Sequence, residues 1–87
     1  MKIAIITNIT KDTGFATAMR VADFLSGKAE LYMSDDCSLP NEFMVSYIPY
    51  EKIWETVELA IVIGGDGTLL QIASRCTQNS IPTLGIN

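Results

Sequence analysis

A glycine-rich segment carries the residues best suited to chemistry. It reads Gly64-Gly65-Asp66-Gly67-Thr68, and it follows an apolar run and precedes residues with helical spacing. This pattern predicts a strand that turns into a helix. At such a turn the backbone N–H groups and the positive end of the helix dipole converge, which favours binding of an anion and of phosphate in particular. Glycines lack a Cβ and tolerate positive φ, so a phosphate can approach their backbone closely.

The carboxylate of Asp66 needs its own explanation, because a carboxylate is a poor ligand for phosphate. It can accept a proton from an attacking hydroxyl, or it can share a Mg²⁺ ion with phosphoryl oxygens, and both roles suit phosphoryl transfer. At a helix N-terminus we expect Asp66 to be ionised at neutral pH. Thr68 can donate its hydroxyl to a phosphate or cap the helix. A plainer interpretation stays open, in which Asp66 and Thr68 are only turn and cap residues, because short glycine motifs also occur by chance.

Other sites for phosphates, metals or nucleophiles fit the sequence less well. A dinucleotide G-x-G-x-x-G motif would need glycine at Leu70, and the Gly-Lys-Ser/Thr sequence of a P-loop does not occur. The sequence has no histidine, which excludes a histidine-assisted nucleophile and a histidine-containing zinc site within it. Cys37 and Cys76 form no C-x-x-C pair, so we expect two reduced thiols. We assign no set of metal ligands.

Length and charge limit the classes of function. The sequence has 87 residues, with six basic and ten acidic side chains and a net charge of −4. This length suits one small domain. The basic residues are dispersed along the sequence, so nucleic acid is not an expected partner. Apolar runs are too short for a signal-peptide core or a membrane span, and we therefore expect a cytoplasmic protein without a membrane partner.

Short apolar runs alternate with segments of helical period, as is typical of an α/β fold with a mainly parallel sheet. Predicted strands cover 3–7, 29–33, 59–63 and 82–86, and predicted helices cover 13–26, 50–57 and 69–79. Asp12 or Thr13 is the expected cap of the first helix, and Gly27 follows its end. Residues 34–40 are predicted to form a polar turn, and residues 41–49 have no clear pattern.

Two groups of residues outside the glycine-rich segment have more than one interpretation. Phe43, Tyr47 and Tyr50 can form a platform for a ligand, although aromatic residues in a small domain more often pack in the core. The pair Asp35-Asp36 is expected to lie in a solvated turn rather than to hold a metal ion.

The glycine-rich segment and its surroundings resemble NAD kinases. The resemblance rests on the strand at 59–63, on the loop continued by Leu69-Leu70, and on the segment Ile81-Pro82-Thr83-Leu84-Gly85-Ile86-Asn87. Gly-Gly-Asp-Gly followed by Thr or Ser also marks diacylglycerol-type lipid kinases and 6-phosphofructokinases. The Leu-Leu pair and the Leu-Gly-Ile-Asn end are similar to the form found in NAD kinases.

This resemblance implies a three-layer α/β fold with a mainly parallel sheet and a Rossmann-like, phosphofructokinase-like topology. It also implies a transferase that moves the γ-phosphoryl group of ATP, or a phosphoryl group of polyphosphate in some members, to NAD to give NADP. The acceptor would be the 2′-hydroxyl of the adenosine ribose, with Mg²⁺ or another divalent cation bridging the phosphates. Asp66 would be the general base and would contact NAD together with Gly67. Gly64, Gly65 and Thr68 would approach the transferring phosphates.

The resemblance also implies that residues 1–87 form the N-terminal nucleotide-binding domain of a longer enzyme. A mostly β C-terminal domain would complete the dinucleotide pocket, so we expect the 87 residues alone to be inactive and the full-length enzyme to be a homo-oligomer. A lipid kinase domain and a non-catalytic nucleotide-binding module remain as alternatives.

Overall fold

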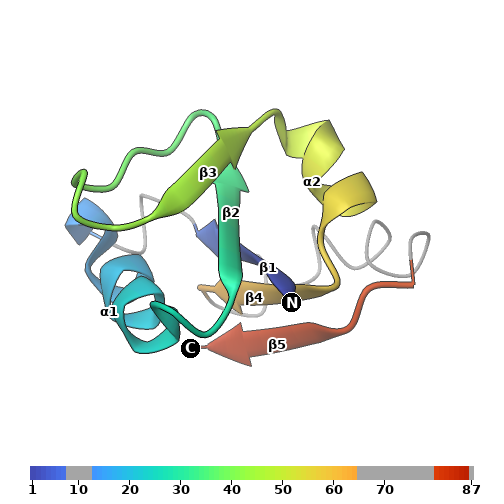
Figure 1. The fold of residues 1–87 in the computed structure, drawn as a ribbon, viewed down its shortest axis with the longest axis horizontal. Coiled ribbons are helices and arrows are strands. Elements are labelled where there is room, and N and C mark those ends of the chain that lie inside the picture. The colour runs from blue at the N-terminus through green and yellow to red at the C-terminus, as the bar shows by residue number, and fades with distance from the viewer. Residues whose placement is uncertain (8–12, 65–79, 87) are drawn as a thin grey trace.

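Five parallel strands form one sheet in the computed structural model, which describes residues 1–7, 13–64 and 80–86 (Figure 1). The strands are β1 (Lys2–Thr7), β2 (Glu30–Ser34), β3 (Val45–Ile48), β4 (Leu59–Ile63) and β5 (Thr83–Ile86). Their spatial order is β3-β2-β1-β4-β5, and every neighbouring pair is parallel. The chain therefore adds β2 and β3 on one side of β1, and then adds β4 and β5 on the other side.

Helices cover both faces of this sheet (Figure 1). They are α1 (Ala16–Leu25), which follows the 3₁₀ turn η1 (Thr13–Phe15), and α2 (Tyr50–Thr56). The core on the α1 side contains Ile3, Ile5, Ala18, Ala22, Leu31, Met33, Leu39, Ile61 and Ile63. The core on the α2 side contains Ala4, Ile6, Ile53, Trp54, Val57, Ala60, Val62 and Ile81. The predicted three-layer α/β fold is thus confirmed, and successive apolar residues of β1 and β4 serve both cores because strand side chains alternate between faces.

The direction of each crossover explains which face it covers. The steps from β1 to β2 and from β2 to β3 run the same way along the sheet, and α1 and the segment 35–44 both contribute to the α1-side core. The step from β3 to β4 runs back, and α2 packs on the opposite face. Right-handed crossovers require this arrangement. The segment 35–44 takes the place of a helix beside α1, but it forms only turns and irregular backbone.

The C-terminal end of α1 follows the expected capping rule, whereas its N-terminal end does not. Gly27 follows the helix with a φ of 77°, and the Lys28 N–H donates to the Leu25 carbonyl at 2.9 Å, as expected for a glycine after a helix end. At the start the predicted cap was wrong, because the cap residue is Phe15, with a φ of 59° and no side-chain cap. Thr13 lies within η1, and Asp12 lies outside the described residues. Phe15 packs against the α1-side core directly before the helix begins.

The other elements lie close to their predicted positions, with one addition. The strands at 3–7, 29–33, 59–63 and 82–86 and the helix at 50–57 each appear within a residue or two of the expected bounds. Strand β3 arises from residues 41–49, for which the sequence predicted no element. The helix predicted at 69–79 lies outside the described residues. Neither described helix is long and apolar enough to cross a membrane.

The buried indole nitrogen of Trp54 has no hydrogen-bond partner among the described residues, and substitutions can test what this costs. The residue is 3% exposed and meets Tyr50 edge to face, with the ring centroids 5.7 Å apart, yet within the described part of the chain its Nε1 has no hydrogen-bond acceptor. An unpaired buried donor costs about 1–3 kcal/mol. We therefore expect Trp54→Phe, which removes the N–H, to change the free energy of unfolding by less than about 1 kcal/mol. Trp54→Ala should cost about 3–5 kcal/mol.

Urea unfolding followed by circular dichroism measures both effects, because fluorescence is lost with the single tryptophan. A Trp54→Phe variant as unstable as Trp54→Ala would show that the indole, through its N–H or its larger ring, contributes stability that phenylalanine does not replace.

Candidate phosphate-binding site

The candidate site lies where the carboxyl ends of β1 and β4 meet. Thr7, the last residue of β1, is in register with Ile63, the last residue of β4. From β1 the sheet continues through β2, and from β4 it continues through β5 on the other side. Connections that leave neighbouring strands in opposite directions open a crevice at their carboxyl ends, which is the usual ligand site of open parallel sheets. Gly64, the first residue of the glycine-rich segment, follows directly from β4.

Gly64 adopts the conformation that its place in the motif predicts. Its φ is 139°, a value that side chains other than hydrogen rarely permit, and its N–H donates to the Ile86 carbonyl at 3.0 Å. This hydrogen bond ties the start of the loop to the end of β5, so the two segments that carry the sequence resemblance meet in space. Gly65, Asp66, Gly67 and Thr68 lie outside the described residues.

Replacing Gly64 by alanine should strain the backbone where the loop begins. We expect Gly64→Ala to lower the free energy of unfolding by about 1–3 kcal/mol, because a residue with a Cβ is unfavourable at this φ. Gly27→Ala is the matched control at a helix end, where the φ of 77° is left-handed and no atom lies within 4 Å of an added Cβ. There the expected loss is about 1 kcal/mol. Equal losses in urea unfolding would show that Gly64 is not specially constrained.

Thr7 is a candidate site residue that the sequence analysis did not single out. It is half-buried, and it follows four apolar residues of β1 at the end of that strand, in register with the residue before Gly64. The polar residue at the end of the run Ile3-Ala4-Ile5-Ile6 was the available signal. Only the pairing of β1 with β4 reveals that it lies next to Gly64.

The aromatic residues 43, 47 and 50 do not form a common platform. Phe43 packs against the α1-side core, whereas Tyr50 packs against the α2-side core. The Tyr47 hydroxyl accepts a hydrogen bond from the Leu39 N–H at 2.8 Å. The idea of a ligand platform is therefore wrong, because the sheet separates Phe43 from Tyr50.

Asp35, Asp36 and Cys37 form a turn rather than a reactive centre. Both carboxylates are exposed, and the described residues contain no group of three potential metal ligands. Burial raises the pKa of the Cys37 thiol to about 11, and the charge of Asp36 and a 3.6 Å contact from Sγ to its Oδ1 act in the same direction. The thiol is therefore protonated, and unreactive, at neutral pH.

This raised pKa predicts slow alkylation. In a Cys76→Ser variant at pH 8, we expect iodoacetamide to modify Cys37 roughly ten- to a hundredfold more slowly in the folded protein than in urea, because the thiolate is scarcer. The rate should climb as the pH approaches 11. The unfolded chain loses the thiol proton at a lower pH than the folded one, so this group also favours unfolding as the pH rises above about 9. Equal rates in folded and unfolded protein would contradict the shift.

The topology and the position of Gly64 define a class of protein. The chain is a doubly wound α/β domain whose strand order reverses between β1 and β4, the point at which such domains usually bind their ligands.

Comparison with known sequences adds the family. Residues 3–87 match the model of the ATP-NAD kinase N-terminal domain, and the chain belongs to this family. An NAD kinase of Lachnoclostridium phytofermentans is 37% identical over 87 residues, covering 99% of this chain and 29% of the relative. An NAD kinase of Agathobacter rectalis is 32% identical over 87 residues, covering 95% and 29%. One from Aromatoleum aromaticum is 35% identical over 74 residues, covering 79% and 24%. The chain thus spans less than a third of the length of these relatives.

Proposed function

We propose that residues 1–87 form the N-terminal nucleotide-binding domain of an NAD kinase that converts NAD to NADP with ATP as phosphoryl donor. The observation that carries the proposal is the position of Gly64. The first glycine of the motif follows β4 at the reversal point of the sheet, in a chain of the ATP-NAD kinase family. A phosphate-binding loop belongs at this point in an open parallel sheet.

The reaction assigns separate roles to the residues of the motif. Asp66 takes the proton from the 2′-hydroxyl of the adenosine ribose as that oxygen bonds to the γ-phosphorus of ATP and ADP leaves. Asp66 and Gly67 contact NAD, while the backbone N–H of Gly65 and the hydroxyl of Thr68 donate hydrogen bonds to the transferring phosphates. These donors offset the negative charge that the phosphoryl oxygens carry. Gly64, whose own N–H is bonded to Ile86, lets the phosphates approach the start of the loop closely.

A divalent cation such as Mg²⁺ would neutralise phosphoryl charge in this reaction. The described residues contain no group of three potential ligands for it. Mg²⁺ usually binds through substrate phosphates and one or two carboxylates, and we propose Asp66, which lies outside the described residues, as the carboxylate of the motif. We also propose a cytoplasmic location, where both cysteines would stay reduced.

The direct test uses the full-length protein with NAD, ATP and Mg²⁺, and measures NADP with an NADP-specific dehydrogenase. We expect NADP to form, and a parallel reaction with polyphosphate shows which donor is used. A folded full-length protein that makes no NADP with either donor would overturn the proposal. Phosphorylation of diacylglycerol by that protein would then support a lipid kinase, and nucleotide binding without turnover would support a non-catalytic module.

A further inference from the structure

A groove lies at the amino ends of β2 and β3, away from Gly64 at the carboxyl end of β4. It has a volume of about 940 Å³ and runs between the C-terminal end of α1, the start of β2 and the segment 39–47. The glycine-rich segment follows the carboxyl end of β4, whereas the groove is bounded by the amino ends of β2 and β3. The groove exists because the connection from β2 to β3 contains no helix to fill the space beside α1.

The floor of the groove is apolar and its wall is held in place. Ala22, Leu31 and Leu39 lie beneath it and are only 2%, 4% and 5% exposed, so its accessible apolar surface comes mainly from half-buried Phe43 and from Met44. The Leu39 N–H donates to the Tyr47 hydroxyl at 2.8 Å, which joins the wall segment to β3. The groove is therefore preformed, which reduces the entropic cost of binding a ligand there.

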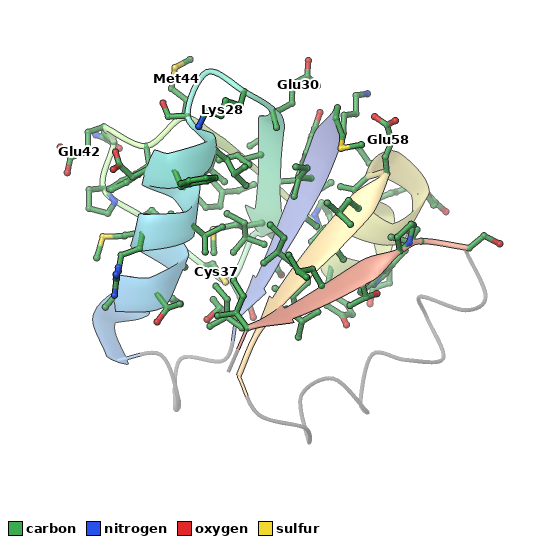
Figure 2. The ribbon with its side chains drawn as sticks, turned by 90° about the horizontal axis from the view of Figure 1, so that it is seen from below. Lys28, Glu30, Cys37, Glu42, Met44 and Glu58 are labelled. Atoms are coloured by element: carbon green, nitrogen blue, oxygen red, sulfur yellow. The ribbon has the colours of Figure 1, made fainter. Side chains whose placement is uncertain are left out.

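The charged residues along the groove are all acidic. Asp23, Glu30 and Glu42 line it and are exposed, and the described lining includes no lysine or arginine. Lys28 stands near these acids at the end of α1 (Figure 2), but it is not part of the lining, and its Nζ lies over the Phe24 ring at 4.3 Å from the centroid. The C-terminal end of α1 also borders the groove and adds the negative end of a helix dipole.

An exposed apolar side chain stands beside these acids. Met44 lines the groove and is 89% exposed, which is unusual for a large apolar residue without a partner. Figure 2 shows Glu42, Met44 and Glu30 along one side of the molecule, next to the C-terminal end of α1. An apolar floor, an apolar rim residue and an acidic border together match a segment with the opposite charge.

We infer that this groove docks a basic segment of a partner protein, with a large apolar side chain against Phe43 and Met44 and Lys or Arg side chains facing Asp23, Glu30 and Glu42. A second copy of the chain matches the surface less well, because its net charge is −4 and a two-fold contact would bring the same acids together. The docked segment leaves the carboxyl ends of β1 and β4, with the proposed nucleotide site, open.

The test selects random peptides displayed on phage against the immobilised full-length protein. Enriched peptides are synthesised, and their Kd is measured by fluorescence anisotropy. We expect peptides with net positive charge around a large apolar residue, and affinity that falls with added salt. The double variant Glu30→Lys, Glu42→Lys should weaken the Kd about tenfold or more, while Glu51→Lys, an exposed change on α2 outside the groove, should leave it unchanged.

Several results would overturn the inference. One is enrichment of neutral or acidic peptides. Another is a set of peptides that the wild-type protein and the double variant enrich equally. A third is an equal Kd for the double variant and the Glu51→Lys control. Sedimentation velocity tests the competing occupant: a dimer of the wild-type protein that Met44→Asp abolishes would assign the groove to a second copy. If the double variant does not fold, Met44→Ser replaces it, and a Kd unaffected by loss of this side chain would count against docking.

Discussion

Replacing Asp66 by asparagine in the full-length enzyme should lower turnover by roughly 10² to 10⁴ while the fold is preserved. Asparagine keeps the shape and much of the hydrogen bonding of the carboxylate, but it cannot accept the proton of the 2′-hydroxyl. The loss should therefore appear mainly in kcat, because binding of NAD and ATP does not require the base. NADP formation under saturating substrates, with circular dichroism as a check on folding, measures the effect.

Asp35→Asn provides the matched control for this experiment. Asp35 is an exposed carboxylate in the turn after β2, so its replacement should leave turnover near that of the wild type. Near-normal kcat in Asp66→Asn would remove Asp66 from the role of general base. A rise in KM with unchanged kcat would instead assign Asp66 to substrate binding alone.

Truncating Ile5 to alanine should cost about 2–5 kcal/mol in the free energy of unfolding. Ile5 is 1% exposed in the central strand, pairs with Ile61 of β4 and belongs to the α1-side core. Its removal leaves a cavity between the sheet and α1, and strands on both sides limit how far the backbone can relax. Urea denaturation followed by circular dichroism measures the loss.

Two further variants make this prediction interpretable. Ile5→Val removes a single methylene and should cost about 0.5–1.5 kcal/mol, so it reports on the same site if Ile5→Ala does not fold. Leu84→Ala changes a 54% exposed residue of edge strand β5 and should have a much smaller effect than Ile5→Ala. Similar losses at Ile5 and Leu84 would contradict the assignment of the core to the centre of the sheet.

The tertiary contacts explain why some elements were predictable and others were not. Strands β1 and β4 were predicted because both of their faces are buried, so each appears as a continuous apolar run. Strand β3 was missed because it is a four-residue edge strand whose middle residues are exposed, and such a segment has no distinctive pattern. The start of α1 was misplaced because Phe15 takes a left-handed conformation and packs against the α1-side core, a contact that local capping rules do not include.

The sequence by itself determined the α/β class, the strand that leads into Gly64 and the chemical character of the segment that follows. These properties depend on local periodicity and on residue type, which the chain displays directly. Only the tertiary structure decided that β1 lies beside β4, that Thr7 therefore adjoins Gly64, and that Gly64 is tied to Ile86. Strand order and the groove beside α1 depend on the direction of crossovers and on contacts between residues far apart in the chain, and local patterns carry little information about either.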